Sequence, residues 1–88
     1  MPELCRFLGL IIKMQYDDHE PPHVHVWYGG RYAAKVDIMK AELLEGRLPR
    51  VQLAFVVSWI AMHQRELASA WDKVMNDRPP GKIAPLRK

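Results

Sequence analysis

The sequence predicts an α+β domain in which a small antiparallel meander of three to four strands packs against one long C-terminal α-helix. Three observations support this prediction. Apolar residues alternate along the first part of the chain, a Gly-Gly pair separates two β-rich runs, and apolar residues later recur at three- and four-residue steps. Alternation is the period of a half-buried strand, whereas the longer steps are typical of a helix with one buried stripe. With 88 residues, the chain is expected to build one core.

The first predicted strand runs from Phe7 to Tyr16, where every second residue is apolar. Residues 17–22 follow as a loop, because prolines lack the donor for a strand ladder and carboxylates favour turns. A second strand is predicted over 23–28, and a returning strand over 32–39 follows the Gly-Gly turn. A short fourth strand over 42–45 ends at a glycine.

The register of the Gly-Gly hairpin decides which side chains share a face. If the two glycines alone form the loop, the histidines of the second strand share a face with the apolar residues of the returning strand. If Arg31 joins the loop, Val24 and Val26 line up with those apolar residues instead. We predict the three-residue loop, because a one-residue slip reverses every side chain and this register unites the valines. It also places Asp37 opposite His23.

A long helix is predicted to open at Leu48-Pro49-Arg50 and to end near Asn76, since proline is tolerated in a first helical turn. Residues 77–88 are too rich in proline and glycine to continue it and form a basic tail, whose Ile83 and Leu86 could dock on the domain. Residues 1–76 are therefore expected to form one domain in the order β-β-β-β-α. The predicted stripe that packs on the sheet consists of Leu53, Val56, Val57, Ile60, Leu67, Trp71 and Val74.

Charge and cysteine content indicate which partners and which cellular compartment to expect. A net charge of +3 is compatible with nucleic acid or an acidic protein partner. Cys5 is the single cysteine, and a lone thiol fits a reducing compartment, so we expect a cytoplasmic protein. The first residues lack the layout of a signal peptide, and no stretch approaches the ~20 apolar residues that span a membrane.

The segment 17–25, Asp-Asp-His-Glu-Pro-Pro-His-Val-His, carries the residues best suited to chemistry. His23 and His25 project from one strand face, separated by two residues of ~3.3 Å each, so both rings can converge on one atom. With His19 they could act as general acid and base near neutral pH, and a phosphodiester would suit such a pair. Alternatively, His19 is a loop residue that bonds the backbone.

Zinc is the cofactor kept as an alternative, because three histidines with a carboxylate would satisfy it, although no residue is assigned as a ligand from the sequence. Asp37, by strand register, and Glu45, by its closeness to the helix start, are the carboxylates paired with the histidines. His63, one turn beyond Trp59 on the helix, completes the catalytic candidates. Its alternative role is that of a helix histidine bonded to Glu66 or solvent.

A second group of candidates is expected to contact a partner or nucleic acid. Trp27 extends the histidine face and could stack on a base, or it could be a packing residue at a sheet edge. Basic residues of the sheet are mostly surface charges, some of which could contact phosphate. The candidates are Asp18, Trp27, Tyr28, Arg31 and Lys35.

Several strings in the chain form a recognisable set: Arg6-Phe7, Asp18-His19, Pro21-Pro22-His23, His25-Val26, Tyr28-Gly29-Gly30, Leu44-Glu45-Gly46, Leu48-Pro49, Trp59 and His63. Together they resemble the small bacterial domain family of unknown function numbered 4160. The string Asp-His-x-Pro-Pro-His-x-His is its specific part. Lys40-Ala41 stands where the family often carries Thr-Gly, and a tail like Ile83-Ala84-Pro85-Leu86 also fits.

The resemblance implies a bacterial or phage protein often encoded beside a second small domain of unknown function, numbered 2442. That arrangement is similar to a type II toxin and antitoxin pair, in which this chain would be the toxin and the second protein its antitoxin. We therefore predict a toxin component that acts on RNA or another nucleic acid through its histidines, as a ribonuclease or nuclease. Two alternatives stay open: a non-catalytic module that binds protein or DNA, and a metal-binding domain.

Overall fold

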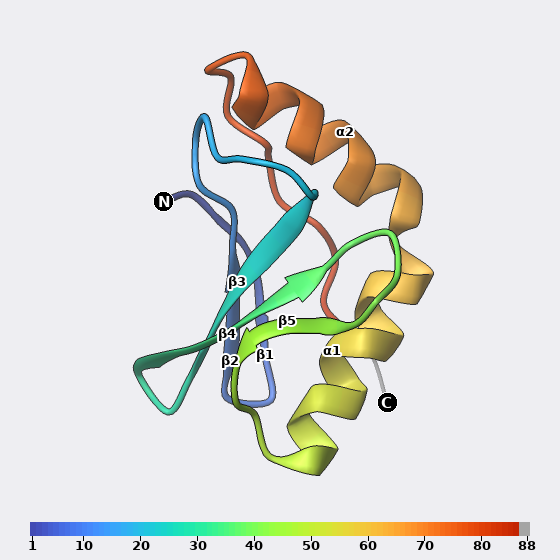
Figure 1. Cartoon of the computed structure of the whole chain (residues 1–88). Coiled ribbons are helices and arrows are strands. Elements are labelled where there is room, and N and C mark those ends of the chain that lie inside the picture. The colour runs from blue at the N-terminus through green and yellow to red at the C-terminus, as the bar shows by residue number, and fades with distance from the viewer. Residues whose placement is uncertain (87–88) are drawn as a thin grey trace.

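The computed structural model describes residues 1–86 and shows a five-stranded antiparallel sheet covered on one face by two helices (Figure 1). The predicted α+β class is confirmed, whereas the predicted three to four strands and one long helix are wrong. The sheet is a meander in which neighbouring strands follow the chain order. The elements are β1 (Glu3–Phe7), β2 (Leu10–Lys13), β3 (His23–Tyr28), β4 (Arg31–Asp37), β5 (Leu43–Gly46), α1 (Arg50–Met62) and α2 (Gln64–Met75).

The additional strand is β1, which lies almost wholly before the segment predicted as one strand over 7–16, and a turn near the start of that segment shortens it to β2. Leu8 and Gly9 have φ angles of 51° and 79°, left-handed torsions that reverse the chain within two residues. Leucine rarely adopts such torsions, so the alternation of apolar residues gave no sign of the turn. Leu10 and Ile12 on β2 are nevertheless buried, as the alternation predicts.

The predicted long helix is divided at a single residue, His63, whose φ of −124° and ψ of 30° lie outside the helical range. The His63 N–H donates to the Ile60 carbonyl and the Leu67 N–H donates to the His63 carbonyl. One irregular residue barely alters the phase of the buried stripe, which is why the pattern predicts one helix. Neither α1 nor α2 combines the length and the apolar character needed to cross a membrane.

The β3–β4 hairpin turns through two glycines and then gains one residue in β4. Tyr28 lies opposite Arg31, so the loop has two residues and the predicted three-residue loop is wrong. The register shifts between Val26 and Trp27, because Ala33 is an extra residue of β4. Such a β-bulge moves the following part of the strand by one position.

Beyond this bulge, the pairs are those expected from the longer loop. Val24 lies opposite Val36, and His23 lies opposite Asp37. Both valines are fully buried beneath the helices, and alternation directs the histidines of β3 to the other side of the sheet. We call this side, away from the helices, the open face. Its central residues are Lys13, His25, Trp27, Tyr32 and Lys35, as the register shows.

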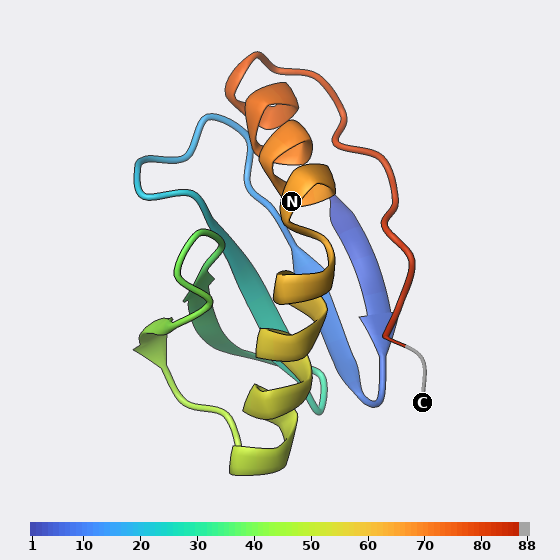
Figure 2. The same cartoon turned by 90° about the vertical axis from the view of Figure 1, so that its right-hand side faces the viewer.

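The core lies between the sheet and the helices, and residues 77–86 run back beside β1 to close it (Figure 2). Trp59 is fully buried, and its Nε1–H donates to the Ala84 carbonyl at 2.7 Å. The N–H of the buried Ile83 donates to the Leu4 carbonyl at 2.9 Å. Leu86 also packs against the core, so the tail docks as its apolar residues suggest, while residues 87 and 88 of the predicted tail lie outside the described residues.

We predict that Gly46 tolerates no side chain, because it lies against the β4 bulge. Its φ is +83°, and a Cβ at this position would collide with the Ala33 carbonyl oxygen. Gly46→Ala should lower the free energy of unfolding by about 2 kcal/mol or more, since a left-handed torsion and the displaced bulge both cost energy. Urea denaturation measures the change.

Gly30→Ala is the matched control, because Gly30 has a φ of +79° but no atom within 4 Å of a built Cβ. It should cost about 1 kcal/mol, the torsional part alone. Equal losses for the two variants would show that the contact with the bulge has no importance.

Candidate functional site

Asp18 lies between His23 and His25 where β3 begins, and these three residues are called here the Asp-His cluster. Its Oδ2 is 2.9 Å from His23 Nε2 and 3.0 Å from His25 Nε2. The side chains of Asp18, His23 and His25 are only 8%, 2% and 6% exposed. One ligand-type atom from each lies within 4.8 Å of the other two, and no other such group occurs in residues 1–86.

The loop between β2 and β3 carries Asp18 into this position because it is fastened to α2. The Asp17 N–H donates to the Val74 carbonyl at 3.1 Å, and Asp17 has a left-handed φ of 50°. The Trp71 Nε1–H reaches Glu20 Oε2 at 3.4 Å. The loop therefore folds back beside α2, and the Asp18 carboxylate turns toward the first residues of β3.

The two ring nitrogens of His23 have different environments. Nδ1 lies 2.7 Å from the Pro21 carbonyl oxygen, and because a carbonyl only accepts, Nδ1 carries the hydrogen. Nε2 has no hydrogen-bond partner among the described residues, although Asp18 Oδ2 is 2.9 Å away, since a ring nitrogen without hydrogen and a carboxylate oxygen both only accept. A buried polar atom in this state typically costs about 1–3 kcal/mol.

His25 and Asp18 are coupled through a hydrogen bond in which His25 Nε2 donates to Asp18 Oδ2. Burial lowers the pKa of His25 below its usual value, and the neighbouring His23 adds to this, although Asp18 opposes it. Burial alone would raise the pKa of Asp18, but hydrogen bonds from His25 and the His19 amide lower it overall. The arrangement favours an ionised Asp18 beside a neutral His25.

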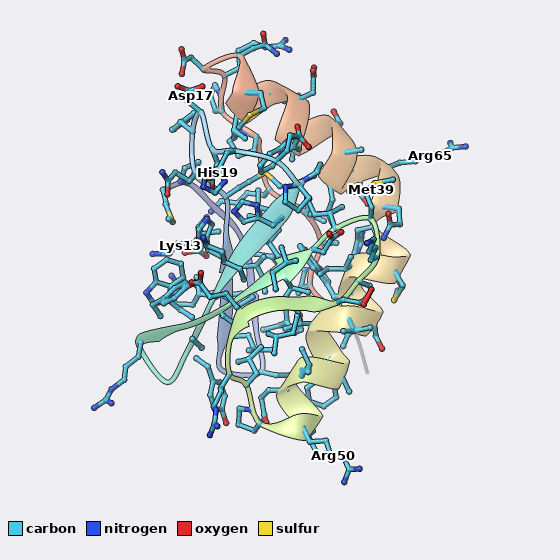
Figure 3. All side chains as sticks on the ribbon, in the orientation of Figure 1. Lys13, Asp17, His19, Met39, Arg50 and Arg65 are labelled. Carbon is cyan, nitrogen blue, oxygen red and sulfur yellow. The ribbon has the colours of Figure 1, made fainter. Side chains whose placement is uncertain are left out.

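His19 stands at the solvent rim of the cluster. Its side chain is 81% exposed, and its Nδ1 lies 3.6 Å from Asp18 Oδ1. The ring centroid is 6.2 Å from that of His23. Figure 3 shows His19 and Lys13 on the side of the sheet away from the helices, so His19 faces the same solvent as the open face.

The remaining catalytic candidates make other contacts. Asp37 lies opposite His23 and is buried, but its Oδ1 accepts the Lys40 N–H at 2.9 Å and so caps a turn. His63 Nδ1 lies 2.6 Å from Glu66 Oε1, the alternative considered for this helix residue. Neither belongs to the Asp-His cluster.

Glu45, the second predicted carboxylate, also lies outside the cluster. Its Oε2 accepts the Tyr32 hydroxyl at 3.1 Å, and its Oε1 lies 3.7 Å from Lys35 Nζ. Burial, with the hydrogen bond and the charge of Glu45, raises the pKa of Tyr32 to about 12.

The predicted binding residues divide between the two faces of the sheet. Trp27 and Lys35 lie on the open face, whereas Tyr28 packs against the core and the exposed Arg31 borders the hairpin turn. Tyr32 is a member of the open face that sequence reasoning missed. The two-residue loop would have identified it, because that register places Tyr32 opposite Trp27.

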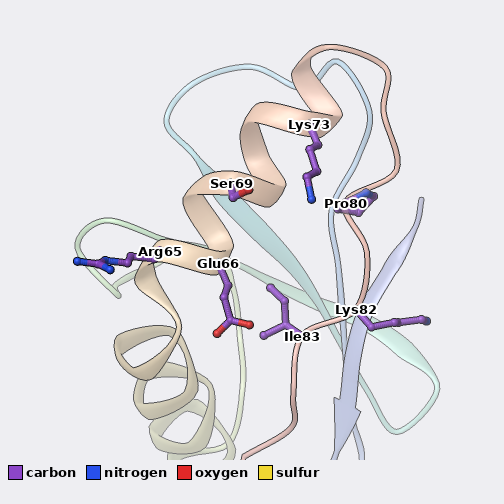
Figure 4. Close-up of a pocket in the computed structure, with 7 residues that line it drawn as sticks. All are labelled: Arg65, Glu66, Ser69, Lys73, Pro80, Lys82 and Ile83. Atoms are coloured by element: carbon purple, nitrogen blue, oxygen red, sulfur yellow. The ribbon is translucent and has the colours of Figure 1, made fainter.

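A separate hollow of about 320 Å³ lies between α2 and the tail. Figure 4 shows the side chains of Glu66 and Lys73 directed into it and that of Arg65 directed away. Its wall also includes Ser69 and Ile83, and none of its lining residues belongs to the Asp-His cluster.

Comparison with known protein families matches residues 9–72 to the family described as Domain of unknown function (DUF4160). No curated protein and no solved structure matches the chain. The matched span includes the Asp-His cluster and the central residues of the open face.

We predict that the metal-free protein titrates at His25 with a midpoint below the ordinary value of 6.5. Asp18→Asn should lower this midpoint further, because it removes the carboxylate charge that favours the protonated ring. The ring-proton shifts of His25 in NMR spectra, recorded with a chelator present, measure it.

Asp37→Asn is the matched control, since Asp37 is the other buried carboxylate on this side of the sheet. Its replacement should leave the His25 midpoint in place. A higher midpoint in Asp18→Asn would contradict the assigned coupling.

Proposed function

The chain belongs to the family described as Domain of unknown function (DUF4160), and we propose that it binds single-stranded nucleic acid on the open face of its sheet. The observation that carries the proposal is the pair of aromatic rings of Trp27 and Tyr32, with two lysines in the neighbouring row of the open face. We call Lys13, Trp27, Tyr32 and Lys35 the aromatic strip. Rings interleaved with cations are the common means of holding unpaired bases and their phosphates.

The two rings form an aromatic surface beside the hairpin turn. Their centroids are 5.2 Å apart and the ring planes meet at 74°, an edge-to-face contact that holds both in place. Tyr32 is 42% exposed and Trp27 is half-buried, whereas Trp59 and Trp71 lie in the core. A base can therefore stack at this pair without any rearrangement of the core.

Two lysines lie beside the rings on the open face. Lys13 Nζ lies 4.4 Å from the Trp27 ring centroid, within the range of a cation–π contact. Lys13 and Lys35 lie opposite His25 on its two neighbouring strands, so they are about 10 Å apart across the sheet. The exposed pair between Lys35 and Glu45 is weak, and a phosphate can replace the carboxylate.

The Asp-His cluster borders the aromatic strip. The His25 ring centroid is 6.1 Å from that of Tyr32 and 6.5 Å from that of Trp27. His23 and His25 are covered as they stand, while His19 is exposed. Cleavage of nucleic acid by these histidines stays a prediction, and it would require the loop that carries Asp18 to open.

Trp27→Leu should weaken binding of a labelled single-stranded oligonucleotide by about 1–3 kcal/mol, the usual contribution of one base–aromatic stack. Fluorescence anisotropy at low salt measures the dissociation constant. Binding should also weaken steadily as salt increases, because the lysines displace counterions from the phosphates.

Tyr16→Leu is the matched control, because Tyr16 is 39% exposed but lies outside the aromatic strip. It should bind the oligonucleotide as the wild-type chain does. An equal loss in the two variants, or tighter binding of a duplex than of a single strand, would contradict the proposal.

We also propose the cellular setting that the family resemblance implies, a cytoplasmic toxin neutralised by a small antitoxin of the 2442 type. Expression of the chain alone should arrest bacterial growth, and co-expression of such an antitoxin should restore it. The double variant His23→Ala/His25→Ala, with folding checked by circular dichroism, should lose the arrest if the histidines act on the target. Normal growth with the wild-type chain would contradict the toxin role and leave nucleic-acid binding as a separate question.

A further inference from the structure

We propose that Asp18, His23 and His25 hold one divalent transition-metal ion, with zinc as the preferred ion. This site goes beyond nucleic-acid binding and does not depend on it, because its ligands belong to the Asp-His cluster and not to the aromatic strip. Its three ligand atoms are Asp18 Oδ2, His23 Nε2 and His25 Nε2. His25 Nε2 carries a hydrogen in the metal-free protein, so binding of the ion moves the ring hydrogen of His25 to Nδ1: the Nε2 proton is released to solvent and Nδ1 takes one up.

The donor atoms already converge at nearly the spacing that a metal requires. The carboxylate oxygen lies 2.9 Å and 3.0 Å from the two nitrogens. Tetrahedral zinc with bonds of 2.0–2.1 Å separates its ligand atoms by about 3.3 Å. The carboxylate oxygen therefore needs to move back from each nitrogen by only a few tenths of an ångström, while the two nitrogens, which lie within 4.8 Å of each other, must reach the same spacing around the ion.

His23 Nε2 is the strongest single indication of a ligand. The ring is buried, and its Nδ1 is committed as a donor to the Pro21 carbonyl, so the neutral ring has a lone pair on Nε2. No described residue hydrogen-bonds to this atom, and the nearby Asp18 Oδ2, 2.9 Å away, is itself only an acceptor. A cation between the three donors would accept the lone pair and offset the charge of the carboxylate.

The surroundings of His23 match those of a metal-bound histidine. Such a ring usually donates its other N–H to a carbonyl or carboxylate, which fixes the ring and its tautomer. In this chain, His23 Nδ1–H donates to the Pro21 carbonyl oxygen at 2.7 Å. The Trp71 ring also packs against His23, with 5.3 Å between the ring centroids.

The donor set indicates the kind of ion. Imidazole nitrogens suit zinc, copper, iron and nickel, whereas magnesium and calcium prefer oxygen ligands. Three protein ligands leave a further coordination position, as in catalytic zinc sites. The exposed His19, whose Nδ1 lies 3.6 Å from Asp18 Oδ1, or a water molecule can take that position.

The test is a titration of chelator-treated full-length chain with zinc chloride by isothermal calorimetry. One ion per chain is expected, and cobalt(II) in place of zinc should give the visible absorption of a four-coordinate site. His23→Gln and Asp18→Asn should each weaken zinc binding at least about tenfold, because loss of a supporting contact alone has that effect.

His63→Gln is the matched control, since His63 also pairs with a carboxylate, that of Glu66, but lies outside the cluster. It should bind zinc as the wild-type chain does. Circular dichroism checks that each variant is folded, and His25→Gln replaces His23→Gln if the latter is not. Absence of zinc binding in folded wild-type protein, or an equal loss in His63→Gln, would overturn the proposal.

No nucleic acid is present in this titration, so its failure is distinct from failure of the proposed function. Zinc binding without oligonucleotide binding would remove the proposed function alone, and the reverse result would remove the metal site alone.

Discussion

The extra residue at Ala33 determines what each face of the sheet can carry. Without it, the two-glycine loop would place Val24 opposite Lys35, and an apolar side chain would share a face with a cation. The bulge is held from β5, where the Arg47 N–H donates to the Ala33 carbonyl and Gly46 leaves room for it. Separation of the apolar core from the polar open face therefore depends on a contact that lies far from the histidines in sequence.

β3 connects the two features to which we assign function. Its first half supplies the histidines of the Asp-His cluster, and its second half supplies Trp27 to the aromatic strip. The loop before it provides the carboxylate, so one continuous segment of the chain carries most of the chemistry. Burying the ionised carboxylate of Asp18 is unfavourable unless cations or hydrogen-bond donors compensate for the lost water. Of the two histidine rings, only that of His25 donates a hydrogen bond to it.

Much of this arrangement could be predicted from the sequence, because it depends on local periodicity. The limits of β3 and the common face of His23 and His25 follow from alternation and from the flanking prolines and glycines. The turn at Leu8 and the break at His63 could not be predicted, since each is a single irregular residue that leaves the apolar pattern in phase. The hydrogen-bond partners of the other predicted catalytic residues could not be predicted from the sequence either. Strand register places Asp37 beside His23, but a turn amide takes its carboxylate, which only the folded chain reveals.

The docked tail makes the two borders of the sheet unequal. The Ile83 N–H occupies a carbonyl of β1, while β5 at the opposite border has every residue exposed, including Leu43 and Leu44. Free strand borders are the places where sheets from different molecules join, and a molecule with one such border can join a single neighbour there. Growth into filaments by strand addition needs two free borders, and the Ile83 hydrogen bond occupies one of the backbone positions that such growth would use on β1.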